Sequence, residues 1–218
     1  METIIRKGTF LLLFLVACST VNPIRSDCKR TLKEERREIK VEEARNSAAE
    51  DLLLSAERWI NIRELTGNND HPMITKAMEL CGLSGNRGYA WCAASQAEIH
   101  DYAGLIAPHS ARVMDWFSQN IVWIVEFGEL PLFDKRGMVG GLYYSNLGRL
   151  GHIVLIVGED KNNYYTLEGN TNIAGSREGD GFYKKIRDKE HVVALADYCL
   201  IGNMFIKKYD DYLQSKLK

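Results

Sequence analysis

Three residues of this 218-residue chain, Cys92, His152 and Glu168, have the types and the order of a nucleophile, a base and a group that orients the base. Cys92 follows Trp91 in the stretch YAWCAASQAEIH, at the head of a run that is typical of a helix. Unpaired N–H groups and partial positive charge at a helix N-terminus favour the thiolate form of a cysteine. A buried cysteine that serves only for packing is the alternative, so Cys92 alone does not define the chemistry.

The base and its orienting group are predicted on two neighbouring strands. His152 opens HIVLIVG, which is apolar after the histidine and therefore typical of a strand covered on both faces. If residues 159–161 form a hairpin loop, Glu168 of NYYTLEGN lies directly opposite His152. A carboxylate at that position can accept the imidazole N–H and fix its tautomer. Asn170 shares this face if the strand continues, and a one-residue change of loop length would break the register.

The surrounding pattern predicts helices first and strands afterwards. Ser47 to Glu50 has the form of a capping box, and apolar residues at helical spacing follow it up to Gly67. Further helices are expected over residues 73–80 and from about Trp91 to just before Gly104. Short β-like runs follow at residues 142–144, 152–157, 164–167, 182–186 and 198–206. This order predicts an α+β domain with a mainly antiparallel sheet.

The N-terminus has the pattern of an export signal. Arg6 and Lys7 precede an apolar run, residues 10–17, that is too short for a permanent membrane span. Its end, Leu-Val-Ala-Cys18, resembles the lipobox of bacterial lipoproteins, in which the cysteine carries the lipid. The alternatives are an ordinary signal peptide and an uncleaved anchor. The predicted organisation is a signal peptide at 1–18, a charged tether or helix at 19–46, and a catalytic-type domain at 47–218.

Composition limits the remaining function classes. Hydrophobic residues at 45% and charged residues at 26% are ordinary for a globular domain. The formal net charge of −1, with no basic stripe, argues against a nucleic-acid partner. Five cysteines leave Cys28, Cys81 and Cys199 after lipidation of Cys18 and use of Cys92, and their spacing does not resolve a disulfide. The cysteines also lack the short spacing of a zinc site.

The same residues carry a family resemblance. GYAWCAASQAEIHDYAGL, GHIVLIV, YYTLEGNTN and GDGFYKKIR, with RELTGNND at residues 63–70, resemble the CHAP domain, a family of cysteine- and histidine-dependent amidohydrolases and peptidases. The resemblance covers roughly residues 48–206 and implies a papain-like fold. It makes Cys92 the nucleophile, His152 the general base, Glu168 its orienting group and Asn170 an accessory polar group.

This resemblance implies hydrolysis of an amide bond in the peptide part of bacterial peptidoglycan, by an endopeptidase or an N-acetylmuramoyl-L-alanine amidase. Trp91, Tyr143 and Tyr144 are the aromatic residues expected to wall the cleft. The chain has no clear acidic loop of the calcium-binding kind, so neither a metal nor another cofactor is inferred. The expected location is the cell envelope, on its periplasmic or surface face, with the membrane reached through a lipid on Cys18.

Two other functions remain open at this point. NlpC-type cell-wall peptidases have a similar fold, but they usually place a second histidine where this chain has Glu168. A non-catalytic envelope lipoprotein that binds peptidoglycan or a protein partner would keep the cleft without needing a reactive thiol.

Overall fold

The computed structural model describes residues 22–84, 88–128, 130, 133–174 and 179–200. The chain divides into two units, residues 1–43 and residues 44–218. The predicted signal peptide and its Cys18 lie outside the described residues. Within the described part, no helix combines the length and the apolar character that a membrane span requires.

The first helix is longer than predicted at one end and shorter at the other. Helix α1 runs from Asn22 to Glu57, so the charged segment before residue 47 is helical, one of its two predicted forms, but the separate helix start predicted at Ser47 is wrong. The residues before Ser47 are mainly Glu, Lys and Arg, which are good helix formers, and nothing in them ends a helix. The predicted end at Gly67 is also wrong, because a turn follows Glu57 and Asn61 adopts a left-handed φ of 72°.

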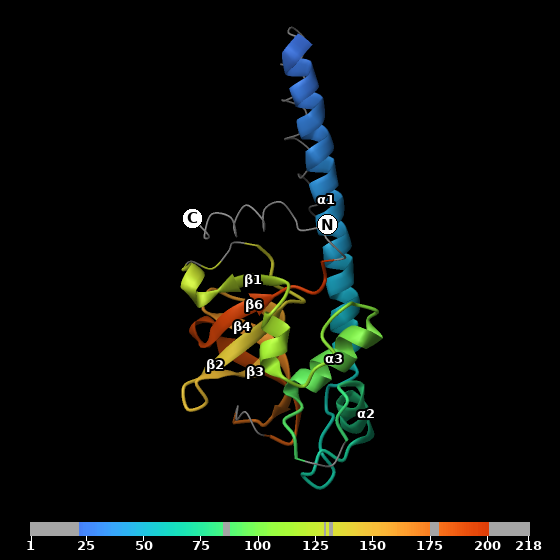
Figure 1. Cartoon of the computed structure of the whole chain (residues 1–218), viewed down its shortest axis with the longest axis vertical. Helices are drawn as coiled ribbons and strands as arrows, with labels where there is room; N and C mark the ends of the chain where they lie inside the picture. The colour runs from blue at the N-terminus through green and yellow to red at the C-terminus, as the bar shows by residue number, and fades with distance from the viewer. Residues whose placement is uncertain (1–21, 85–87, 129, 131–132, 175–178, 201–218) are drawn as a thin grey trace, which may run out of the picture. The chain divides into compact units, whose positions relative to one another are not determined.

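The two shorter helices agree with prediction. Helix α2 spans Pro72–Leu80, and the ring Nδ1 of its N-cap residue His71 accepts a hydrogen bond from the Met73 N–H. Helix α3 spans Cys92–Tyr102, and its residues 92–100 are all buried. It packs against α2 and against two strands of the sheet, β3 and β4 (Figure 1). A helix buried on all sides is held rigidly, so the position of its first residue is well defined.

In the part of the chain that the structure describes, six strands form one antiparallel sheet, which is the other layer. Its strands are β1 (Ile121–Ile124), β2 (Val139–Tyr144), β3 (Arg149–Glu159), β4 (Asn163–Thr171), β5 (Gly181–Asp188) and β6 (Val192–Ala196). They lie in the order β1-β6-β2-β3-β4-β5, and every neighbouring pair is antiparallel. Short 3-10 helices occupy Val113–Phe117, Val125–Phe127 and Lys189–His191. The chain is therefore α+β, as the order of the sequence patterns predicts.

The sheet differs from prediction at one edge. Strands β1 and β6 were not expected, and β6 lies between β1 and β2. The strand expected over residues 198–206 is wrong for residues 198–200, which form no strand, and its remainder lies outside the described residues.

Buried aromatic side chains fix the beginning of α3 against the sheet. The Trp59 ring stacks on Trp91 with 6.1 Å between centroids and contacts Phe182 of β5 at 5.7 Å. Gly169 of β4 lies so close to α3 that an added Cβ would be 2.7 Å from the Trp91 ring and would also collide with Ser95. The lack of a side chain at Gly169 therefore allows the start of α3 to approach β4.

Candidate active site

The hairpin that carries His152 and Glu168 has a different register from the one predicted. Glu159 pairs with Tyr164, and a bulge then shifts the register so that Leu155 pairs with Leu167. Counting on from that pair places Val154, not His152, opposite Glu168. The predicted register is therefore two residues wrong: the turn shifts the pairing by three residues, and the bulge in β3 shifts it back by one.

A shift of two residues keeps every side chain on its own face of the sheet. His152 and Glu168 therefore remain diagonal neighbours on one face, within reach of long side chains. The His152 Nε2 lies 3.0 Å from Oε2 of Glu168, and both side chains are fully buried. The predicted pairing of histidine and carboxylate is present, although by a diagonal contact.

The Glu168 carboxylate has further donors that the sequence analysis did not find. Thr166 Oγ1 donates to Oε1 at 2.5 Å, while Arg187 donates to Oε1 through Nε at 2.8 Å and to Oε2 through Nη2 at 2.5 Å. Alternation along β4 could have identified Thr166, which lies two residues from Glu168. Arg187 lies opposite Tyr164, so only its length lets it reach a carboxylate four residues further along β4.

These donors control the charge of the carboxyl group. Burial alone would raise the Glu168 pKa, but the hydrogen bonds from Arg187 and His152 and their charges lower it to about 2. Glu168 is therefore ionised at neutral pH and held in place by three side chains, so it can orient the imidazole and stabilise its protonated form.

Cys92 is the first residue of α3 and lies beside the other nitrogen of the His152 ring. Nε2 is bonded to Glu168, and the buried Nδ1 has no conventional hydrogen-bond partner among the described residues. The thiol interacts with the His152 side chain and with the backbone N–H groups of Ala93 and Ile153. Nδ1 is therefore the nitrogen that faces the sulfur.

The pKa values of cysteine and histidine are shifted in opposite directions. Burial raises the Cys92 pKa, but the hydrogen bond and charge of His152 outweigh it, so the net shift is downward. For His152, burial lowers the pKa, while hydrogen bonds and charges from Cys92 and Glu168 raise it to about 9. Both shifts favour a thiolate–imidazolium pair at neutral pH, the reactive form of a cysteine nucleophile.

Asn170 does not continue the Glu168 face as expected. The register of β4 with β5 breaks between Glu168 and Thr171, and Asn170 has a left-handed φ of 55°. It is buried and lines a cavity of about 360 Å³, whose other walls include Glu64 and Asp180. The assumption of a regular strand is wrong at this point because the bulge interrupts the alternation.

The three aromatic residues expected to wall the cleft do not line the cavity at Cys92. Trp91 is completely buried, and its Nε1 donates to Glu64 at 2.8 Å, so it packs the core behind the helix. Tyr143 is 52% exposed at the end of β2. Tyr144 is the last residue of β2, and an added Cβ at Gly151 would lie 2.9 Å from its ring. None of these three residues is among those that line the cavity at Cys92.

The cavity that does reach the sulfur has a volume of about 290 Å³. Its lining consists of Ala90, Cys92, Ala111, Arg112, Val113, Met114, Arg149 and Gly151. Cys92 itself is only 1% exposed, so this cavity is the route by which a ligand would reach the thiol. The segment before the first 3-10 helix and the start of β3 form the walls, and the sequence analysis missed both.

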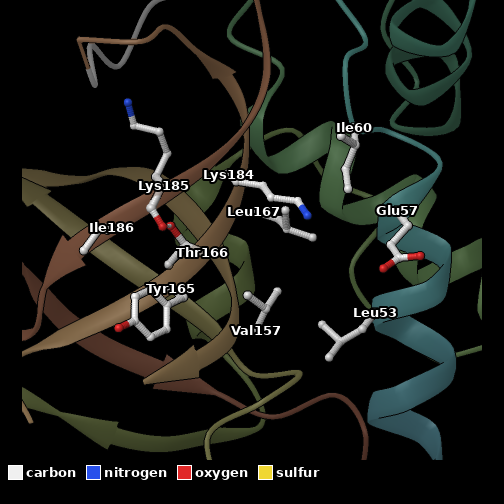
Figure 2. A pocket seen from close by; sticks show the side chains of 10 residues that line it. All are labelled: Leu53, Glu57, Ile60, Val157, Tyr165, Thr166, Leu167, Lys184, Lys185 and Ile186. Atoms are coloured by element: carbon white, nitrogen blue, oxygen red, sulfur yellow. Dashed lines mark hydrogen bonds between the residues drawn. The ribbon is translucent and has the colours of Figure 1, made fainter. Parts of the chain in front are cut away.

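A further cavity, of about 370 Å³, lies between α1 and the strands β4 and β5. Figure 2 shows Leu53 and Glu57 projecting from α1 on one side, with Val157 and Leu167 on the sheet opposite them. It contains none of the residues predicted for the site. Its lining includes polar residues, among them Thr166 and Lys184, but neither Cys92 nor His152, so the cavity at Cys92 is the better candidate for catalysis.

The other described cysteines have a different character. Cys81 and Cys199 are free, so they form no disulfide. Burial raises the Cys81 pKa to about 11, and burial with the nearby Asp197 raises that of Cys199 to about 12. Of the three cysteines whose side chains are described, Cys92 is thus the one with a lowered pKa. Among the described residues, no three His, Cys, Asp or Glu side chains gather in a way that could hold a metal ion.

Comparison with known proteins gives no independent assignment. The chain matches no protein-family model, no curated protein sequence and no solved structure.

Proposed function

We propose that this protein is a cysteine-dependent hydrolase that cleaves an amide bond in the peptide part of bacterial peptidoglycan. The observation that supports this most strongly is the geometry around His152. One ring nitrogen bonds to a buried, ionised Glu168, while the other faces a cysteine at a helix N-terminus. A cysteine that served only for packing would not need its pKa lowered by a buried imidazole.

The proposed reaction proceeds through a thioester. The Cys92 thiolate attacks the carbonyl carbon, and the resulting oxyanion is stabilised by the N–H of Cys92 at the start of α3. The His152 imidazolium then gives its proton to the departing amine nitrogen, which leaves the acyl group on the sulfur. Neutral His152 next takes a proton from water, whose oxygen attacks the thioester and releases the carboxylic acid and the thiolate.

Two observations support the substrate class. The sequence resembles CHAP domains, and the helix that carries the cysteine packs on an antiparallel sheet. In this proposal the fold is a papain-like CHAP fold, and the function is that of an endopeptidase or an N-acetylmuramoyl-L-alanine amidase. The protein acts in the cell envelope as a lipoprotein anchored through Cys18. Residues 19–46 then separate the hydrolase domain from the lipid.

Digestion of purified sacculi by the full-length chain in detergent tests the function. Under reducing conditions the wild type should release soluble fragments, and Cys92→Ala should not. Mass spectrometry of the products identifies the bond: free stem peptides with intact glycans indicate an amidase, and shortened or uncrosslinked peptides indicate an endopeptidase. A wild-type protein that pellets with sacculi and releases nothing would instead indicate a non-catalytic binding lipoprotein.

A further inference from the structure

The cavity beside Cys92 carries an excess of positive charge on two separate walls. Arg112 comes from the segment before the first 3-10 helix and Arg149 is the first residue of β3, and both line the same cavity as the sulfur. None of the other lining residues is acidic. With the imidazolium of His152 behind the thiolate, this side of the site favours a negatively charged ligand group.

Among the described residues, Arg112 has one carboxylate nearby, in an exposed ion pair with Asp115. The Arg112 side chain is 80% exposed, and its Nη1 lies 3.7 Å from Oδ1 of Asp115, too far for a hydrogen bond. The other oxygen of Asp115 accepts a hydrogen bond from Ser110 at 2.6 Å, so this carboxylate is shared between two partners. Such a surface pair contributes little energy and can be exchanged for a ligand.

Arg149 has an even weaker protein partner. Its Nη1 donates to the carbonyl oxygen of Leu150 at 3.0 Å, and the described residues give it no ion pair. The remaining N–H groups of its guanidinium can still donate to a ligand. A planar guanidinium binds a carboxylate through two parallel hydrogen bonds, which a point charge such as lysine cannot reproduce.

We propose that Arg112 and Arg149 form a carboxylate-binding subsite, which holds a free carboxylate of the peptide substrate next to the carbonyl that Cys92 attacks. This inference rests on the proposed function. It makes the hydrolase selective for acidic peptides and explains why the cavity has basic walls in a chain whose net charge is −1. Val113 and Met114 line the same cavity and supply apolar surface on which the aliphatic part of the substrate packs.

Alkylation of Cys92 tests the subsite without requiring a wall substrate. Iodoacetate and iodoacetamide differ in carrying a carboxylate or a neutral amide, and peptide mapping measures the rate at Cys92 for each. The quantity compared is the rate with iodoacetate divided by the rate with iodoacetamide. The imidazolium of His152 attracts iodoacetate in every variant, so a change in this ratio on mutation reports the effect of the arginines alone. At low salt in water, a unit charge at about 7 Å from a carboxylate changes the rate roughly threefold, so removal of two such charges in Arg112→Gln/Arg149→Gln should lower the ratio about tenfold.

Two variants serve as controls for this experiment. Lys161→Gln removes an exposed positive charge from the turn between β3 and β4 and should leave the ratio unchanged. Arg149→Lys keeps the charge and should retain most of the preference for iodoacetate. An unchanged ratio in the double arginine variant, with Cys92 still reactive, would overturn the subsite.

A binding measurement separates failure of the subsite from failure of the proposed function. Calorimetric titration of the full-length chain with N-acetyl-alanyl-alanine and with its carboxamide needs no reaction at Cys92. The wild type should bind the acid more tightly than the amide, and the double variant should bind both alike. If Cys92 proves inert while this difference is lost in the double variant, the subsite stands and the hydrolase proposal fails. Equal binding of acid and amide by the wild type overturns the subsite.

Discussion

Replacing Arg187 should destabilise the protein strongly, although the residue lies outside the predicted catalytic set. The guanidinium makes two hydrogen bonds to Glu168, with side chains only 15% and 0% exposed. At a charge separation of about 4 Å and an effective dielectric constant of about 20, this pair is worth about 4 kcal/mol. Breaking a buried ion pair by removing one partner costs a similar amount, about 3–5 kcal/mol. For a domain of this size, Arg187→Gln should lower the melting temperature by roughly 10 °C.

The same substitution should move the alkaline limb of the pH–rate profile upwards. The active thiolate–imidazolium pair is lost as the pH rises through the His152 pKa of about 9. Removing the positive charge of Arg187 leaves Glu168 free to stabilise the imidazolium alone, so the His152 pKa rises. Glu168→Gln removes the negative charge instead, and the limb should move to lower pH. A merely structural role for Arg187 would lower the melting temperature without shifting this limb.

Thermal unfolding followed by circular dichroism measures the melting temperature. Rates of sacculus hydrolysis or of Cys92 alkylation, measured across roughly pH 5–10, locate the alkaline limb. Arg136→Gln is the matched control, because the Arg136 pair with Asp134 is 50% and 38% exposed and should contribute less than about 1 kcal/mol. The reasoning is refuted if Arg187→Gln melts with the wild type, or if Arg187→Gln and Glu168→Gln shift the alkaline limb in the same direction.

Three other expectations can be checked separately. Metabolic labelling with a clickable fatty acid should mark the wild type and not Cys18→Ala, and equal labelling of both would contradict the lipoprotein proposal. Arg45→Gln should lower stability by about 3 kcal/mol in chemical unfolding, because it leaves the fully buried Asp197 without its 2.9 Å ion pair; an unchanged midpoint would show that the pair contributes nothing. At pH 7, iodoacetamide should alkylate Cys92 much faster than Cys81, whose pKa is raised to about 11, and preferential labelling of Cys81 would contradict the assigned charge states.

The helix and strand that carry the reactive pair could be predicted because their signals are local. The run after Trp91 and the apolar run after His152 each specify one element without reference to the rest of the chain. The contact between His152 and Glu168 was predicted correctly from an incorrect register, because a shift by an even number of residues leaves each side chain on the same face of the sheet. The bulge and the longer turn together shifted the hairpin by two residues, so each side chain kept its face.

The features that prediction missed depend on contacts between distant segments. Strand β6 inserts between β1 and β2, and hydrophobic alternation does not specify the order of strands in a sheet. The contact of Arg187 with Glu168 needs the register of a third strand and a long side chain that reaches along it. The bulge at Asn170 lies next to Gly169, where α3 approaches β4 closely, and no local pattern in the sequence reveals this contact. The capping box at Ser47 was misleading because a strong helical sequence precedes it.

The most direct test of the central claim is a double-mutant cycle on the reactive pair, measured as the rate of sacculus hydrolysis. Cys92 and His152 are proposed to act as one thiolate–imidazolium unit, and groups that act as a unit are not additive. Cys92→Ala, His152→Ala and the double variant should therefore be about equally inactive, all remaining folded. Wild-type rates in Cys92→Ala, or losses that simply multiply in the double variant, would contradict the assignment of this pair as the catalytic centre.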